Sequence, residues 1–245
     1  MVHSPRKMDR LLCRLMTTLA KRYVLGIQGH TEVIGPERGP FILAMNHNQR
    51  YEALLIPALL HFYRQGKPIH FLADWQYMLM PGVASLYRAG GTIITTRKNA
   101  RPRFLNVFKP IFKHPVPAYQ RALTKLENGA PIGIFPEGTL NRDPNQLLRG
   151  FHGAARLALM TGVPVVPAGI RFPLLGAGNH IGDGAKMSLH IGHPLHFDAL
   201  AQASRPRLSE IQSCHRQIMQ ALTEVSGKIW RPGFKKRSSH VSQKS

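Results

Sequence analysis

Short apolar runs alternate with helix-like stretches through the middle of the chain, and this alternation limits the fold more than any other feature. Five runs (FILAM, IHFLA, GTIIT, PIGIF, VPVVPAGI) lie at residues 41–45, 69–73, 91–95, 131–135 and 163–170. Helical patterns are expected between and after them, at residues 52–65, 76–88, 118–128 and 151–161. Strands that alternate with helices are typical of parallel sheets. We therefore expect an α/β fold with a mostly parallel central sheet flanked by helices.

The two ends of the chain differ from this middle part. Residues 6–23 place Leu11, Leu15 and Leu19 on one helical face, with basic residues largely around the other. This pattern is typical of a helix that lies on a membrane surface, and equally of an ordinary helix packed on the domain. A last helix is expected at residues 207–226. We expect an N-terminal amphipathic helix and lead-in at residues 1–28, a main domain at 29–227, and a basic flexible tail at 228–245.

Composition indicates which kinds of partner the protein binds and in which kind of compartment it works. The 245 residues are 43% hydrophobic, which is enough for a substantial core, and 33 Lys and Arg against 12 acidic residues give a net charge of +21. Nucleic acid, acidic lipid and phosphorylated substrates all match this charge. Cys13 and Cys214 lie at opposite ends of the chain and give no disulfide framework, which favours a reducing compartment.

Hydropathy argues against a membrane-spanning segment. No window approaches the ~18 consecutive apolar residues that a spanning helix needs. Near the N-terminus Arg14 splits the apolar stretch and no small-residue cleavage site follows, so no export signal is expected either. Residues 98–119 mix Lys and Arg with three Phe and four Pro, and we expect an irregular basic and aromatic loop there.

The stretch NHNQRYE, residues 46–52, sets a histidine and a carboxylate five positions apart at the end of a buried strand. His47 and Glu52 cannot meet on one helix, because residues five apart point about 140° away from each other. They can meet if the strand ends at Met45, NHNQ turns, and a helix starts near Tyr51. Glu52 would then orient His47 and raise its basicity. Alternatively, Glu52 is only a helix N-terminal charge and His47 a loop residue.

A second stretch, FPEGTLNR, follows the strand at residues 131–135. Glu137, Gly138 and Thr139 offer a carboxylate, backbone N–H groups and a hydroxyl after the carboxyl end of that strand. Ligands of parallel α/β sheets gather at this edge.

Four blocks together resemble those of the glycerolipid and lysophospholipid acyltransferases, the family of the 1-acyl-sn-glycerol-3-phosphate acyltransferases. NHNQRYE is similar to the family's N-H-x4-D block, GTIITTR to G-x5-R, FPEGTLN to F-P-E-G-T-R-S, and VPVVPAGI to V-P-V-V-P. The blocks agree in order and spacing over residues 46–170, about half of the chain.

The resemblance implies transfer of a fatty acyl group from an acyl thioester to the hydroxyl of a lysophospholipid such as 1-acylglycerol-3-phosphate. His47 would be the general base and Glu52 its orienting carboxylate, with no covalent enzyme intermediate. Acceptor binding would fall to Gly91, Arg97, Lys98, Glu137, Gly138, Thr139 and Arg142. No metal and no cofactor are expected, since acyl-CoA or the thioester of an acyl carrier protein is the co-substrate. The N-terminal helix, the basic and aromatic residues 98–119 and the net charge predict that this enzyme is cytoplasmic and attached peripherally to the anionic inner face of a membrane.

Two positions depart from the family pattern. The chain has Glu52 where the family usually has Asp, and Leu140 where it usually has Arg or Lys. The first departure keeps the carboxylate. The second weakens the expected phosphate site, and Arg142, two positions on, is the candidate that would replace the missing charge.

Two other features suggest different functions. His190, His193 and His196 invite a metal site, but side chains alternate along a strand, so His193 would point away from the other two. The net charge invites nucleic acid, but the chain shows no zinc-finger spacing, no RNA-binding aromatic motif and no base-reading helix. No nucleic acid is therefore expected. A non-catalytic module that binds anionic lipid or nucleic acid stays the alternative to an enzyme.

Overall fold

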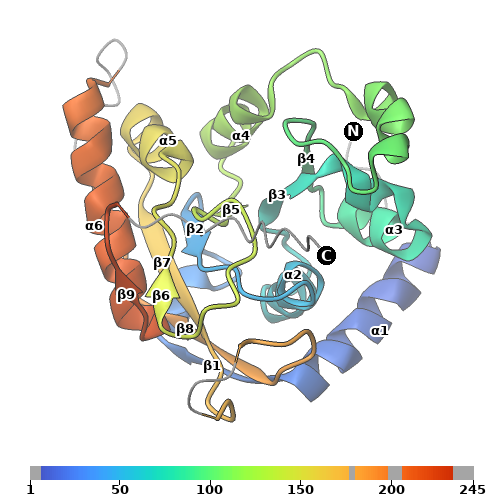
Figure 1. The fold of residues 1–245 in the computed structure, drawn as a ribbon, viewed down its shortest axis with the longest axis horizontal. Helices are drawn as coiled ribbons and strands as arrows, with labels where there is room; N and C mark the ends of the chain where they lie inside the picture. Colours follow the sequence, from blue (N-terminus) through green and yellow to red (C-terminus); the bar gives the residue numbers. More distant parts are fainter. Residues whose placement is uncertain (1–6, 177–179, 198–205, 234–245) are drawn as a thin grey trace, which may run out of the picture.

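The computed structural model describes residues 7–176, 180–197 and 206–233, and a seven-stranded sheet lies at its centre (Figure 1). The strands, in sheet order, are β1 (Val24–Gly29), β8 (Met187–Ile191), β7 (Val165–Arg171), β2 (Ile42–Met45), β5 (Ile132–Ile134), β3 (His70–Asp74) and β4 (Ile93–Thr95). From β7 to β4 all neighbours are parallel. β8 is antiparallel to β7, and β1 is parallel to β8. The expected mostly parallel α/β fold is confirmed.

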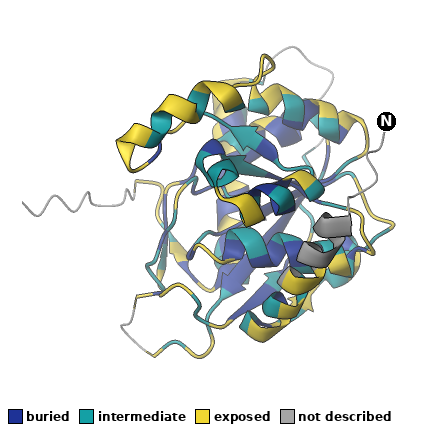
Figure 2. Cartoon of the chain, turned by 90° about the vertical axis from the view of Figure 1, so that its right-hand side faces the viewer, coloured by how far each residue is buried: buried dark blue, intermediate teal, exposed yellow. Residues whose placement is uncertain are grey.

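Helices cover both faces of the sheet. One face packs against α4 (Ala118–Glu127), α5 (Gly153–Thr161) and α6 (Leu208–Ser226), and the other against α1 (Lys7–Tyr23) and α2 (Glu52–Tyr63). Along β2, Ile42 and Ala44 belong to the first core, and Leu43 and Met45 to the second. The buried strands between helices with exposed outer surfaces are visible in Figure 2. Burial on both faces explains why FILAM reads as an unbroken apolar run.

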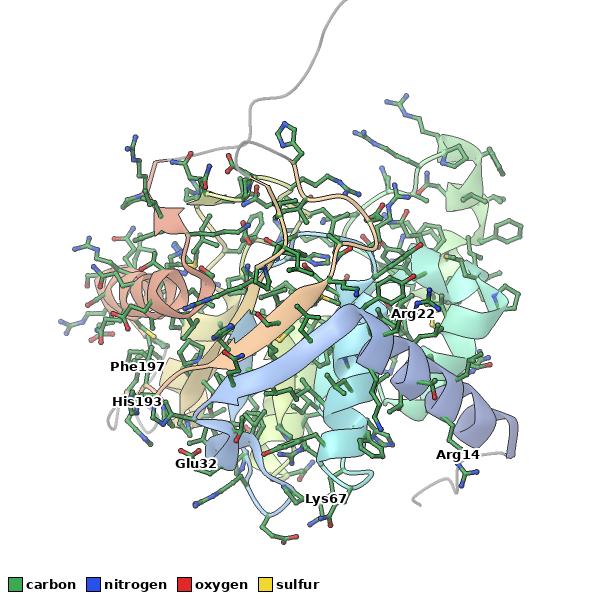
Figure 3. All side chains as sticks on the ribbon, turned by 90° about the horizontal axis from the view of Figure 1, so that it is seen from below. Arg14, Arg22, Glu32, Lys67, His193 and Phe197 are labelled. Carbon is green, nitrogen blue, oxygen red and sulfur yellow. The ribbon has the colours of Figure 1, made fainter. Side chains whose placement is uncertain are left out.

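The N-terminal helix packs on the domain through its last turns. Ala20 is fully buried and Leu19 packs against the same core, whereas Leu15 is exposed. Arg14 points away from the molecule (Figure 3). After α1 the chain enters the sheet directly as β1. Residues 24–28, expected to be a lead-in, thus form part of the edge of the sheet.

Residues 98–119 are more regular than expected. They contain a 3₁₀ helix, η3 (Arg103–Phe112), so the prediction of an irregular loop is wrong for this part. Asn106 fixes its start, because its side chain accepts from Ala100 N (2.9 Å) and donates to the carbonyl of Arg103 (2.7 Å). Phe112 stacks on the buried ring of Trp75 at the other end. Asn106 and Phe112 therefore hold a short helix. The sequence did not predict it, because its prolines are typical of loops.

The first residues of the expected flexible tail belong to the folded domain. Lys228 is buried, and β9 (Ile229–Trp230) pairs with β6 (Gln146–Leu147). The rest of that tail, from residue 234, lies outside the described residues. No helix within the described ranges is long and apolar enough to cross a membrane. Cys214 is buried and not part of a disulfide.

A close backbone contact brings the end of α6 onto β7. A Cβ added at Gly169 would lie 2.1 Å from the backbone of Val225, near the helix end, whereas one added at Gly26 in β1 would meet nothing within 4 Å. Only glycine therefore permits this approach at position 169.

We predict that Gly169→Ala lowers the free energy of unfolding by about 1–3 kcal/mol, because α6 has to move away from the sheet. Gly26→Ala is the matched control and should change stability by no more than about 1 kcal/mol. Urea unfolding followed by circular dichroism measures both variants. Equal stability of the two variants would contradict the assigned contact.

Candidate active site

His47 and Glu52 meet at the carboxyl edge of the sheet. β2 ends at Met45 and α2 begins at Glu52, so the intervening turn folds the two side chains together. His47 Nδ1 lies 3.1 Å from Glu52 Oε2. The Glu52 side chain is fully buried, whereas 15% of the His47 side chain is exposed. The contact expected from the sequence is present, and it leaves the imidazole reachable from solvent.

Three donors surround the Glu52 carboxylate. Besides the His47 ring, Asn48 donates its backbone N–H to Oε2 (2.7 Å) and its side-chain NH₂ to Oε1 (2.9 Å). An ionised carboxylate only accepts hydrogen bonds, so Nδ1 of His47 must carry the proton in this pair. In the neutral tautomer with the proton on Nδ1, the other ring nitrogen, Nε2, has a free lone pair.

The loop after β5 is tied to the loop after β2 through Glu137. This carboxylate is buried and accepts from the backbone N–H of His47 (3.1 Å), the backbone N–H of Leu148 (2.9 Å) and the side chain of Asn141 (2.7 Å). Asn141 N also donates to the carbonyl of His47 (2.7 Å). Burial raises the pKa of Glu137, and these hydrogen bonds together with Lys228 offset part of that rise. The buried Glu137 side chain thus holds the backbone of His47 in place through a hydrogen bond.

Gly138 and Thr139 stand at the rim of the site. Gly138 has φ +64°, and a Cβ there would come within 2.7 Å of the Phe151 ring, so glycine is needed on both counts. Its carbonyl accepts from Lys98 Nζ. Thr139 is exposed beside it.

Arg97 and Lys98 follow the carboxyl end of β4, at the same edge of the sheet. Both side chains are exposed, and the Arg97 guanidinium lies 5.2 Å from the centre of the Phe151 ring. Trp75 fixes the backbone here by donating to the carbonyl of Lys98 (3.0 Å). The structure thus brings two cationic side chains to the Gly138 rim.

Two residues expected at the acceptor site have other contacts. Gly91 precedes β4, at the opposite edge of the sheet from His47, and its carbonyl lies 2.8 Å from Nδ1 of His70. Arg142 forms an ion pair with Asp183 (2.7 Å) and donates to the carbonyl of Ile181 (2.6 Å). Gly91 therefore lies away from His47, and Arg142 holds the 181–183 loop in this structure.

An apolar pocket opens beside the histidine. Phe135 stacks on His47 with ring centres 4.3 Å apart and also forms one wall of this pocket. Its cavity volume is small, about 40 Å³. Other walls come from α2, β3 and α3 (Pro81–Ala89), and include Ala53, Pro57, Phe71, Leu86 and Tyr87.

Several functional neighbours were missed by the sequence reasoning. Asn46, Asn48 and Gln49 are fully buried although they read as a polar turn. Asn46 bonds both backbone groups of Ile170 in the next strand (3.0 and 2.7 Å). Lys228 donates to the side-chain oxygen of Asn48. The run of amide side chains after a buried strand could have predicted the buried asparagines and glutamine. Nothing in the sequence of the basic tail distinguished Lys228 from the other lysines there.

The histidines near β8 have local contacts. Nε2 of His190 lies 3.0 Å from the Ser188 hydroxyl, and the ring centre of His193 lies 3.6 Å from that of His30. His193 sits at the edge of the molecule far from the N-terminal helix (Figure 3). Within the described part of the chain no group of three His, Cys, Asp or Glu is arranged to hold a metal ion.

Comparison with known proteins identifies the family. A family model described as Acyltransferase matches residues 26–171, more than half of the chain. The chain therefore belongs to the acyltransferase family, and it is an enzyme of the O-acyltransferase class. A 1-acyl-sn-glycerol-3-phosphate acyltransferase of Bacillus subtilis is 24% identical over 214 residues, which are 86% of this chain and 95% of that protein.

Two further proteins extend the comparison. A chloroplastic 1-acyl-sn-glycerol-3-phosphate acyltransferase of Arabidopsis thaliana is 24% identical over 217 residues, 84% of this chain and 54% of that protein. The crystal structure of a 1-acyl-sn-glycerophosphate acyltransferase from Thermotoga maritima superposes with a TM-score of 0.56 at 21% identity, covering 92% of this chain and 84% of that one. This last likeness shows that the fold is shared.

Proposed function

We propose that the protein transfers a fatty acyl group from an acyl thioester to the free hydroxyl of a lysophospholipid such as 1-acylglycerol-3-phosphate. The observation that carries the proposal is the His47–Glu52 contact, at the edge of the sheet where parallel α/β proteins bind ligands. An apolar pocket and a cationic rim lie beside this pair. The names of the relatives in Bacillus and Arabidopsis support the same acceptor.

The chemistry needs one base and no covalent enzyme intermediate. Nε2 of His47 takes the proton of the acceptor hydroxyl while its oxygen attacks the thioester carbonyl. The tetrahedral intermediate collapses, the C–S bond breaks, and the imidazolium returns its proton to the leaving thiolate. The products are an ester and a free thiol. Glu52 stabilises the imidazolium that forms between these two steps, because its negative charge lies 3.1 Å from Nδ1.

The apolar pocket suits the acyl chain of the donor. It begins at Phe135, which contacts His47, and so a chain inside it would leave its thioester near the base. Acyl-CoA and the acyl carrier protein thioester both present such a chain on a polar carrier. Donors of increasing chain length, attached to each carrier, measure how far the pocket extends and which carrier is used.

The acceptor phosphate is assigned to Arg97, with Lys98 beside it. Arg97 is exposed, and stacking on Phe151 orients its planar guanidinium without using its N–H donors. Lys98 is partly engaged by the Gly138 carbonyl. The fork of Arg97 therefore is the better match for two phosphate oxygens.

We further propose that the enzyme works peripherally on the anionic, cytoplasmic face of a membrane. Phe104, Val107 and Ile111 of η3 are 71%, 72% and 74% exposed. Between Asp74 and Glu127 the sequence contains no acidic residue, whereas several Lys and Arg surround η3. Each basic residue near an anionic surface contributes roughly 1 kcal/mol. η3 (green, upper right in Figure 1) follows the strand that carries Arg97, so membrane contact would bring lysolipid to that residue.

Membership of the acyltransferase family favours an enzyme over the non-catalytic lipid- or nucleic-acid-binding module, and the reaction itself tests the choice. The enzyme releases thiol from an acyl thioester only when lysolipid is present, and forms a diacyl product. A binding module does neither.

We predict that His47→Ala lowers kcat by about 10²–10⁴-fold, since it removes the base. Glu52→Gln should lower kcat severely too, because its NH₂ group would face a donor and its charge is gone, and Glu52→Asp should retain more activity. The double variant His47→Ala with Glu52→Gln should lose about as much as His47→Ala alone. Thermal unfolding checks that each variant folds. Native turnover by His47→Ala would refute the proposed base.

We predict that Arg97→Lys raises the apparent KM for 1-acylglycerol-3-phosphate, because the charge stays but the fork is lost. An acceptor without phosphate, such as a monoacylglycerol, serves as the comparison, and its KM should not respond. The measurement is initial rate against acceptor concentration at fixed donor. An unchanged KM for the phosphorylated acceptor would move the phosphate site away from Arg97.

We predict that changing Phe104, Val107 and Ile111 together to Ser reduces flotation with anionic liposomes, because the apolar face that enters the bilayer is removed. Leu208→Ser, which alters an exposed leucine on α6, is the control and should float like the native protein. Flotation should also fall as salt rises. Equal binding to neutral and anionic liposomes would count against the electrostatic part of the proposal.

A further inference from the structure

Lys228 is a buried cation behind the proposed catalytic pair. Only 4% of it is exposed, and its Nζ donates to the side-chain oxygen of Asn48 and to the carbonyl of Asp143 (2.6 Å). It follows α6, whose end is held on β7, and it reaches a residue 180 positions earlier in the chain. A buried lysine is costly unless it is paired, so its place calls for an explanation.

The first effect of Lys228 is on the orientation of the Asn48 amide. A lysine ammonium has donors only, so Asn48 must turn its oxygen toward it. The Asn46 amide donates to the same oxygen (3.3 Å). The NH₂ group of Asn48 is therefore left to face Glu52 Oε1, to which it donates at 2.9 Å. Without the cation nothing except Asn46 would prevent the amide from turning over and presenting its oxygen to the carboxylate.

The second effect is on the charge around His47. The charged groups that face Lys228 are Glu52 on α2, Glu137 in the loop after β5 and Asp143 further along that loop. Burial lowers the pKa of Lys228, and these three carboxylates offset part of that fall. A protonated Lys228 therefore removes one unit of the negative charge that these carboxylates place near His47. Its loss would leave the His47 imidazolium in more negative surroundings.

We propose that Lys228 is a positioning residue that locks the Asn48 amide toward Glu52 and moderates the negative charge acting on His47. This inference rests on the proposed function of the His47–Glu52 pair. Lys228 contacts neither of these two residues, and it acts through Asn48 and through its charge.

Three substitutions separate the two effects. Lys228→Met removes donor and charge, and should lower kcat about tenfold or more with little change in either KM. It should also move the acidic limb of the pH–rate profile to higher pH, because the imidazole keeps its proton more readily when a nearby positive charge is gone. Lys228→Gln retains a donor for Asn48, so it should lose less kcat but show the same pH displacement. Lys228→Arg should stay nearest to the native enzyme. Lys67→Met, which alters an exposed lysine paired with Glu37, is the control.

Chemical rescue adds a test that a purely structural role would fail. Lys228 lines a pocket of about 460 Å³ between β1, β7 and the loop that holds Asn145. Butylammonium added to Lys228→Ala should enter there and restore part of kcat, whereas butanol should not. Amines also cleave thioesters directly, so the acylated lysolipid is measured rather than released thiol.

A titration of the His47 ring by NMR needs no substrate and separates this inference from the proposed function. Its midpoint should rise in Lys228→Met and stay in place in Lys67→Met. If the native protein transferred no acyl group but the midpoint still moved, the proposed function would fail, whereas the electrostatic effect of Lys228 on His47 would stand. Native kcat and an unmoved midpoint in Lys228→Met would overturn the inference. Failure of all three Lys228 variants to fold would overturn it too, because Lys228 would then be a structural residue.

Discussion

A fully buried carboxylate, Glu52, is the constraint on which the site depends. A carboxylate without water must be met by donors from the protein, and the surrounding chain supplies them from His47 and from both amides of Asn48. Those donors fix the conformation of the turn after β2, and this turn fixes the position of the His47 imidazole. The same arrangement is repeated one strand away, where Glu137 holds the His47 backbone. Two buried carboxylates thus hold His47: Glu52 contacts its ring, and Glu137 accepts a hydrogen bond from its backbone.

The sheet makes this arrangement possible because its parallel strands end at one edge. β2 delivers His47, β5 delivers Glu137, and β4 delivers Arg97 to that edge. The adjoining strand β7 contributes the backbone of Ile170, which holds Asn46. The proposed base, the carboxylate that holds its backbone and the cationic rim therefore come from neighbouring loops, and the strands set their spacing.

Sequence patterns predicted those parts that depend on periodicity or on a motif. The five neighbouring parallel strands β7, β2, β5, β3 and β4 were found because each contains an apolar run, which in β2, β5 and β7 reflects burial on both faces. The turn after Met45 was found because His47 and Glu52 can meet only if the chain turns between them. β1 was missed because VLGIQG carries two glycines and polar Gln28 at the edge of the sheet. The ion pair between Arg142 and Asp183 was not predicted, because the charge of Arg142 does not indicate which acidic residue lies within reach. Lys228 was assigned to a tail, since only the packing of α6 brings it inward.

The contact between Lys228 and Asn48 has a consequence for the order in which the enzyme is made. The ribosome releases the His47 turn long before it adds α6, so the growing chain holds its two acidic side chains without the cation that later faces them. The last helix has to dock, through Gly169, before that cluster is complete. The enzyme would in this way reach its working form only after α6 has been made, and a chain cut short within α6 would keep the histidine but lack the contact from Lys228.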